Sequence, residues 1–442
     1  MASFASKLAR LPRLPGMPAE PAPEPPQAPP ERTVELDAQA MRPKALPRPA
    51  PVAAPGPPSL DELREKIAAM LGKAPPPAPR ADPTRGELPF LLERTELGPL
   101  YVRRVRSLPG ARVGRAPLVA GRDADPAMLA LLALDPALAG RDPKGALYVD
   151  TETTGLAGGT GTVPFLIGLS WFDAEANAFM LEQVLLRRLG EEAPMLALVA
   201  ERLRAASMIV SYNGKAFDLP LLKTRFVMNR MEAPALPPHL DLVHVARRVH
   251  KARLKSRTLA SIEAEVLGRA RVGDVSGGDI VSTYLHFLRT ADEEALLGVV
   301  EHNAADVLSM VALVGLYGEP LGSLTAGDLA GAARVLRRAG ALDRAAELAD
   351  EAVSRGGGVE AKKARGEIAK ARGDKARALA DYEELSLEVD DPAVRLELSK
   401  LYEHQVTAYG AALMLVAQGT GEGEEAAAKR KARLAKKIGR RR

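Results

Sequence analysis

The residues best suited to do chemistry in this chain are two carboxylates, Asp150 and Glu152, which follow an apolar segment at residues 146–149. Residues i and i+2 of a β-strand project from the same face of a sheet, so a strand over 146–152 would place both side by side. Neighbouring carboxylates repel each other unless a cation lies between them, and oxygen ligands suit hard divalent ions such as Mg²⁺ or Mn²⁺. The spacing therefore predicts one half of a metal site at the end of a strand.

A third carboxylate, Asp218, ends the segment SYNGKAFD at residues 211–218, which follows a buried-type strand predicted over 208–212. It also stands at the start of a helix predicted over 218–229. Two interpretations are open from the sequence. Asp218 either reaches the sheet edge as a metal ligand, or it caps the amino end of the helix, with Pro220 in the first turn.

A fourth carboxylate, Asp306, ends the segment HNAAD at residues 302–306, inside an apolar helix predicted over 292–316. Helical positions i and i+4 lie on one face, so His302 and Asp306 should be adjacent. A histidine, with an unperturbed pKa of about 6.5, could orient or deprotonate a water molecule. A solvated helix face would explain the same residues, so this motif gains its meaning from the other two.

The elements predicted between about 145 and 318 describe one α/β domain that would bring these motifs together. Strands are expected over 146–152, 165–171, 179–186 and 208–212, and helices near 191–206, 218–229, 240–250, 258–267, 279–289 and 292–316. Three sequential strands, a helix and another strand is the order of a ribonuclease H-like mixed sheet flanked by helices.

In their order and composition, the three motifs resemble the bacterial YprB-type, ribonuclease H-like family of four-carboxylate (DEDD) 3′–5′ exonucleases, related to the proofreading domains of family B DNA polymerases. The glycine-rich run at residues 158–165 is also similar to that family. The resemblance covers about 175 residues, or about 40% of the chain. It implies hydrolysis of phosphodiester bonds in single-stranded nucleic acid by a two-metal-ion mechanism.

The resemblance also implies roles for individual residues. Two divalent ions, Mg²⁺ or Mn²⁺, would be held by Asp150, Glu152, Asp218 and Asp306, with His302 orienting the attacking water. The terminal nucleotide would be positioned by Thr153, Thr154, Gly155, Leu156 and Asn213. The sequence does not distinguish DNA from RNA as the substrate.

One spacing departs from the family. In its tyrosine subclass a Tyr stands four residues before the last Asp, and in its histidine subclass a His stands five residues before it. Here His302 stands four residues before Asp306, so the residue type follows one subclass and the spacing the other. This departure leaves open a catalytically weak or inactive nucleic-acid-binding scaffold that recruits proteins through its helical repeats. A structure-specific endonuclease of the same fold is a separate alternative.

The regions outside this domain have different compositions. Residues 1–85 contain 21 of the 36 prolines, which predicts a disordered Pro/Ala-rich region, with a capping box at 59–62 that could start a short helix. Residues 86–144 are expected to form an N-terminal extension packed on the core. Residues 325–420 have helical periodicity and a 33-residue spacing of Gly340 and Gly373, which resembles tetratricopeptide repeats that bind a protein partner.

Charge is concentrated in two places. Residues 421–442 form a basic tail, in which nine of the last 14 residues are Lys or Arg, and a second basic run covers 247–257. The second run either contacts phosphates or is an ordinary solvated helix face.

Several site types are excluded or disfavoured. The absence of cysteine excludes thiolate metal sites and disulfides and fits a cytoplasmic location. No apolar run in the sequence approaches the roughly 18–20 residues that a membrane span needs, so no association with a membrane is predicted. No Lys follows the glycines at 158–162, so a turn is favoured over a P-loop. The pair His239 and Asp241 suggests either a histidine metal site or a helix start capped by Asp241.

Overall fold

The computed structural model describes residues 88–155 and 160–440. The predicted disordered region 1–85 with its short helix, Leu156, and the first part of the glycine-rich run lie outside these ranges. The first part of the described chain forms β1 (Leu91–Thr95), β2 (Gly98–Arg106), β3 (Arg112–Val113), β4 (Ala116–Pro117) and α3 (Pro126–Ala133).

The central part forms β5 (Ala146–Thr153), β6 (Pro164–Asp173), β7 (Ala178–Leu185), α4 (Ala193–Ala205), β8 (Met208–Ser211), α5 (Asp218–Met228), β9 (His239–Asp241), α6 (Leu242–Val249), α7 (Leu259–Ile262), the π-helical turn η4 (Glu263–Leu267), α8 (Gly277–Thr290) and α9 (Glu293–Gly318). The last part forms α10 (Pro320–Ser323), α11 (Ala326–Ala339), α12 (Leu342–Ser354), α13 (Gly358–Arg372), α14 (Lys375–Glu388), α15 (Pro392–Leu401), α16 (Tyr409–Ala417) and α17 (Glu424–Gly439).

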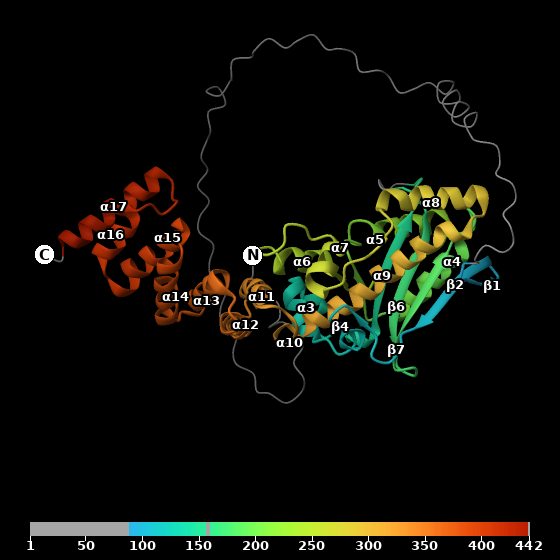
Figure 1. The fold of residues 1–442 in the computed structure, drawn as a ribbon, viewed down its shortest axis with the longest axis horizontal. Helices are drawn as coiled ribbons and strands as arrows, with labels where there is room; N and C mark the ends of the chain where they lie inside the picture. Colours follow the sequence, from blue (N-terminus) through green and yellow to red (C-terminus); the bar gives the residue numbers. More distant parts are fainter. Residues whose placement is uncertain (1–87, 156–159, 441–442) are drawn as a thin grey trace, which may run out of the picture. The chain divides into compact units, whose positions relative to one another are not determined.

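The sheet is mixed, and its strands lie in the order β1-β2-β7-β6-β5-β8-β9. Strand β6 runs antiparallel to both of its neighbours, whereas β8 pairs parallel with β5 and with β9. Strands β5 to β9 therefore have the arrangement of a ribonuclease H-like sheet, and the predicted fold class is confirmed. In Figure 1 the long helix α9 lies along this sheet, and it contacts β5, β6 and β7.

Strand β5 divides its side chains between two hydrophobic clusters. Leu147 and Val149 pack with residues of α4, α5 and α8, whereas Ala146 and Tyr148 pack with residues of α6 and α9. Because successive strand residues face opposite sides, Asp150 continues the face of Tyr148 and points toward α9. This alternation places both carboxylates of the first motif, Asp150 and Glu152, on one face of β5 and Thr151 on the other.

Helix α9 corrects one expectation from the sequence. It is 26 residues long and contains a window of mean hydropathy 1.4, so it meets the length and composition of a membrane span. That window is 67% buried within the fold, which is the behaviour of a core helix. Its apolar length is explained by packing against the sheet, α3 and α8.

The segments on either side of the domain are more closely joined to it than the sequence suggested. Strand β2 is hydrogen-bonded to β7, so the predicted N-terminal extension supplies two strands to the sheet. Helix α11 contacts α6 and α3, and its apolar residues belong to the same cluster as those of α9. The predicted basic tail contains a helix, α17, which packs on α16.

Short elements account for the differences from the predicted secondary structure. Strand β9 has three residues, too few to show a period, and it was predicted as the start of a helix. Asp241 does cap the following helix, since its side chain accepts a hydrogen bond from the Val243 amide at 3.2 Å. The helix predicted over 258–267 is instead a short α-helix followed by the π-helical turn η4.

Candidate active site

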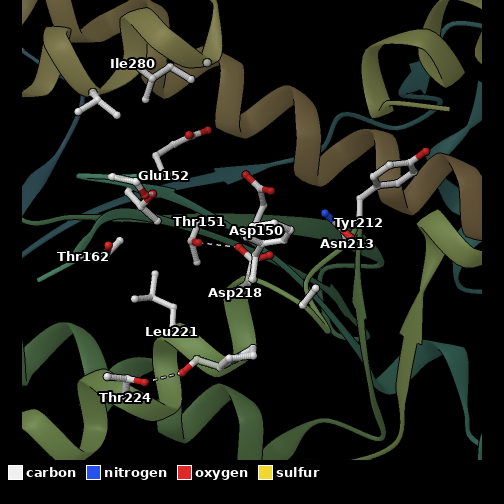
Figure 2. Close-up of a pocket in the computed structure, with 17 residues that line it drawn as sticks. Asp150, Thr151, Glu152, Thr162, Tyr212, Asn213, Asp218, Leu221, Thr224 and Ile280 are labelled. Carbon is white, nitrogen blue, oxygen red and sulfur yellow. Dashed lines mark hydrogen bonds between the residues drawn. The ribbon is translucent and has the colours of Figure 1, made fainter. Parts of the chain in front are cut away.

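The first motif opens onto a cavity of about 490 Å³ at the carboxyl end of β5. Asp150, Glu152 and Asp218 all line this cavity, and Figure 2 shows their side chains close together. Three of the residues expected to position a nucleotide line it too: Thr153, Gly155 and Asn213. Thr154 does not line the cavity, and its hydroxyl accepts a hydrogen bond from the Val163 amide at 3.0 Å. The fifth residue of the predicted set, Leu156, lies outside the described ranges.

Asp218 reaches the site from the opposite side of β5. It is the first residue of α5, and its carboxylate accepts a hydrogen bond from the Thr151 hydroxyl at 2.5 Å (Figure 2). Thr151 alternates with Asp150 and Glu152 along β5 and so projects to the other face. The amino end of α5 has no side-chain cap, so the capping role considered for Asp218 is not seen.

Helix α9 supplies the third motif. The imidazole Nε2 of His302 lies 3.7 Å from an Asp306 carboxylate oxygen and 3.9 Å from a Glu152 carboxylate oxygen. The i and i+4 spacing therefore does place the histidine beside the last carboxylate, as predicted. His302 and Asp306 lie next to the cavity of the first motif rather than among its lining residues.

Asn303, between these two residues, holds the helix to the first motif. Its side-chain amide donates to the Asp150 carboxylate at 2.8 Å, and its carbonyl oxygen accepts from the Gln183 amide at 2.9 Å. Asn303 is fully buried. The sequence places it in the motif, but it carried no predicted role, because the need for a donor to Asp150 arises only when α9 lies on the sheet.

Two further residues in the segment between η4 and α8 were not predicted from the sequence. The Asp274 carboxylate lies 2.6 Å from Nδ1 of His302, and the Arg271 guanidinium pairs with Asp306 and lies 3.2 Å from the same nitrogen. The segment has no strand or helix period, so no pattern in the sequence could assign it to the site.

Arg271 is anchored from behind by a buried carboxylate. Glu263, in η4, accepts hydrogen bonds from the Arg271 guanidinium at 2.5 and 2.7 Å, and it also accepts one from the Ser309 hydroxyl. The Glu263 side chain is fully buried and that of Arg271 is 9% exposed. The guanidinium is therefore a fixed positive charge beside Asp306.

Burial and mutual repulsion change the acidity of the carboxyl groups. Burial, reinforced by the charges of Asp306, Glu152 and Asp218, raises the pKa of Asp150 well above its ordinary value. Burial also raises the pKa of Glu152 to about 7 and that of Asp218 to about 6. These shifts mean that the protein surroundings do not offset the cost of burying these carboxylates in their ionised form.

The donor set fits divalent ions of the hard, oxygen-preferring kind. All four side chains offer carboxylate oxygens, and a cation would stabilise the ionised forms that burial disfavours and would relieve the repulsion that acts on Asp150 and Glu152. In the described ranges, no three acidic or imidazole groups are close enough together to hold a metal ion as they stand. Their donors are turned toward protein partners: Asp150 toward Asn303, Asp218 toward Thr151, and Asp306 toward Arg271.

Two comparisons with known proteins cover the segment that contains this site. Residues 147–317 match the family described as RNase_H superfamily. A 176-residue stretch is 37% identical to the uncharacterized protein YprB of Bacillus subtilis (strain 168), covering 39% of this chain and 42% of that protein. The chain thus spans less than half of the length of this relative. Residues 147–317 therefore form a domain with a ribonuclease H-like fold that is similar to the RNase_H superfamily and to part of YprB.

Proposed function

We propose that this domain is a metal-dependent 3′–5′ exonuclease acting on single-stranded nucleic acid. The observation that supports the proposal best is the convergence of Asp150, Glu152 and Asp218 on one cavity, with His302 and Asp306 beside it. Three segments far apart in the sequence supply these groups, and the fold has no structural need for so much buried negative charge.

The four carboxylates would hold the ions that phosphodiester hydrolysis requires. Asp150, Glu152, Asp218 and Asp306 would be the ligands of two ions, Mg²⁺ or Mn²⁺. When bound, such ions lower the pKa of the attacking water and stabilise the charge that develops on the phosphate and the leaving 3′ oxygen. Asn303 would keep Asp150 in place by its hydrogen bond to that carboxylate.

His302 would accept the proton of the attacking water. A neutral imidazole whose Nδ1–H donates to Asp274 keeps the lone pair on Nε2, the nitrogen that faces Glu152 and Asp306. Asp274 therefore acts through His302 by fixing its tautomer and orientation. On this view His302, which follows the histidine subclass in residue type and the tyrosine subclass in spacing, is compatible with catalysis.

The wall of the cavity offers surfaces for a terminal nucleotide. Phe217 lines the cavity and is 56% exposed, an unusual exposure for an aromatic ring unless a ligand covers it. A base could stack on this ring, since stacking contributes about 1–3 kcal/mol per base and tolerates any base. Thr153, Gly155 and Asn213 would contact the sugar and the terminal phosphate.

The proposal is tested with end-labelled oligonucleotides and the full chain in Mg²⁺ or Mn²⁺. We expect stepwise shortening from the 3′ end, abolished by EDTA and reduced at least about 100-fold by Asp150→Ala or Asp306→Ala. Substrates with a blocked 3′ end separate this activity from that of an endonuclease. The absence of cleavage, or cleavage that both variants retain, would overturn the proposal.

One observation favours the second candidate, a weakly active or inactive scaffold that binds nucleic acid. Arg271 already pairs with Asp306 and so competes with a metal ion for that carboxylate. Calorimetric titration with Mn²⁺ distinguishes the two candidates. If the wild-type chain binds no Mn²⁺ and Glu263→Gln/Arg271→Gln does, Arg271 blocks the site and the scaffold is favoured. The double substitution avoids leaving a buried Glu263 without its partner.

For the helical region we propose a role in recruiting a protein partner. Successive helices from α11 to α16 pack on one another, as in a repeat array. Helices α14 and α16 each expose a large apolar residue, Leu387 and Met414. Affinity capture with the full chain is compared with capture by Leu387→Asp/Met414→Asp. A partner recovered equally by both would exclude this surface.

A further inference from the structure

A second cavity adjoins the candidate active site. It has a volume of about 510 Å³. It shares two wall residues, Tyr212 and Asn213, with the cavity that Asp150, Glu152 and Asp218 line, which we call the catalytic cavity. Figure 2 shows Tyr212 and Asn213 beside one another, next to Asp150 and Asp218. The remaining lining residues come from α6 and from the segment that leads into α7: Val243, Arg247, Lys255, Ser256, Arg257, Thr258 and Leu259. We call this second cavity the basic groove.

The wall between the two cavities is fixed at both of its residues. The Tyr212 hydroxyl donates to the backbone carbonyl oxygen of Arg257 at 2.5 Å. The backbone N–H of Asn213 donates to the Asp241 carboxylate at 2.7 Å. Asn213 has a φ of 73°, a left-handed conformation that asparagine tolerates better than most residues. The groove is thus held in a constant position relative to Asp150 and Asp218.

The lining of the groove is that of an anion site. Three of its residues carry positive charge, none is acidic, and Ser256 and Thr258 add hydroxyl donors. In the described part of the chain, Arg247 and Lys255 are exposed and have no carboxylate partner within ion-pair distance. The Arg257 guanidinium donates to the carbonyl oxygens of Leu254 and Lys255, so its charge also stays unneutralised.

Another basic cavity, between α6 and α11, provides an internal comparison. Its residues Arg334 and Arg337 form ion pairs with Glu360 and Glu367 at 3.0 and 3.4 Å. These pairs neutralise part of its positive charge, whereas Arg248, Lys251 and Arg338 have no ion pair within the described residues. This cavity shares no residue with the catalytic cavity. Of these two basic cavities in the described part of the chain, the basic groove is the one that combines unpaired charge with continuity to the candidate active site.

We infer that the basic groove binds the sugar–phosphate backbone of the strand whose 3′ end occupies the catalytic cavity. This inference rests on the proposed function for the identity of the strand. Arg247, Lys255 and the hydroxyl groups would contact phosphates, which gives affinity without base preference. The strand would pass over Tyr212 and Asn213 from one cavity into the other, a path that suits a flexible single strand better than a stiff paired duplex.

Binding is measured separately from cleavage, with phosphorothioate single strands of DNA and of RNA and the full chain in EDTA. The groove variant is Arg247→Ala/Lys255→Ala. The matched control, Lys144→Ala/Arg289→Ala, removes the same charge from exposed positions before β5 and at the carboxyl end of α8. We expect the groove variant alone to bind about tenfold more weakly and to lower the slope of log K against log salt by about 1.4, or about 0.7 per phosphate contact.

The outcomes separate this inference from the proposed function. An equal loss of affinity in the groove variant and in the control variant would mean that binding depends only on net charge. Tighter binding of a blunt duplex than of a single strand would contradict the strand path over Tyr212 and Asn213. Either result overturns the inference even if the chain cleaves its substrate. If the chain cleaves nothing but only the groove variant loses binding, the groove stands and the exonuclease falls.

A kinetic arm adds a second readout. With active chain, the groove variant should raise KM for an oligonucleotide of about ten residues and leave its kcat unchanged. A dinucleotide, too short to reach the groove, should show no change in either constant. A loss of kcat on the dinucleotide would mean that the substitutions disturb the catalytic cavity, and it would count against the inference.

Discussion

At the scale of single residues, the candidate site combines predicted carboxylates with partners that only the fold supplies. Asn303, Asp274 and Arg271 each touch a residue that the sequence singled out. The carboxylates supply negative charge, and these partners orient it. Loss of such an orienting partner should reduce catalysis without removing the metal ligands.

Asp274→Asn tests the proposed orientation of His302. An asparagine cannot hold the Nδ1–H tautomer as a carboxylate does, so we expect kcat to fall about 10- to 100-fold with KM nearly unchanged. Asp274→Glu should recover part of the loss. In a His302→Ala background, Asp274→Asn should have little further effect on kcat, because both substitutions remove the same function, proton transfer by an oriented His302. Full additivity of the two losses would show that Asp274 acts elsewhere.

The raised pKa values predict how stability depends on pH. In the folded state the pKa of Glu152 is about 7 and that of Asp218 about 6, above ordinary values of 4.5 and 3.8. Between about pH 4 and pH 7 the folded state therefore binds protons that the unfolded state does not. The free energy of unfolding of the metal-free chain should fall as the pH rises through this window.

Divalent ions should oppose this trend, because they bind the ionised carboxylates. Thermal unfolding in EDTA and in Mn²⁺, at pH 6 and at pH 8, measures both effects. We expect a lower Tm at pH 8 than at pH 6 in EDTA, and a larger Mn²⁺-induced increase at pH 8. Asp150→Asn should remove most of the Mn²⁺ effect. A Mn²⁺-induced increase in Tm of equal size at pH 6 and at pH 8 would contradict the assignment of these carboxylates as metal ligands.

At the scale of elements, the site depends on how closely α9 approaches β5 and β6. Gly168 pairs with Asp150 across the two strands. A Cβ at position 168 would lie 2.2 Å from the side-chain oxygen Oδ1 of Asn303 and 2.8 Å from Cγ2 of Val307. The glycine thus creates the space in which Asn303 reaches Asp150.

Gly168→Ala should therefore push α9 away from the sheet. We expect a loss of about 1–3 kcal/mol in stability, as for other overpacked cores, together with a drop in activity. The control is Gly410→Ala, an exposed position in α16 where a Cβ meets nothing within 4 Å. Denaturant unfolding and the nuclease assay measure the two effects. Unchanged activity in Gly168→Ala would show that the contact between Asn303 and Asp150 is dispensable.

At the scale of the whole molecule, the ribonuclease H-like domain and the helical region share a buried polar connection. His250, at the end of α6, lies 2.7 Å from the Asp328 carboxylate of α11 and 2.9 Å from the Tyr317 hydroxyl of α9. Arg253 adds a hydrogen bond to Asp328 at 2.9 Å. His250 therefore serves the packing of α11. The histidine metal site suggested by His239 and Asp241 is not seen in the described residues.

Breaking this connection should destabilise both parts together. Asp328→Ala leaves buried donors without a partner and should cost about 3–5 kcal/mol. Asp343→Ala, which removes an exposed ion pair with Arg372, should cost less than about 1 kcal/mol. Equilibrium unfolding followed by two probes, one in each region, measures both variants. Two separate transitions in the wild-type chain would show that the regions are not coupled.

The sequence by itself determined the residues with chemical potential and most of the elements that carry them. The strand period placed Asp150 and Glu152 on one face, and the helical period placed His302 next to Asp306, since both depend on local backbone geometry. The order of strands and helices likewise predicted the mixed sheet.

Only the tertiary structure decided how these parts meet. Asp218 approaches from the Thr151 side of β5, Asp274 and Arg271 enter from an aperiodic segment, and Tyr212 joins the catalytic cavity to the basic groove. Such contacts depend on which faces pack together across long stretches of chain, and no local pattern encodes them. For the same reason, the two carboxylates of the first motif become a candidate active site only when α5 and α9 close on β5 from opposite sides.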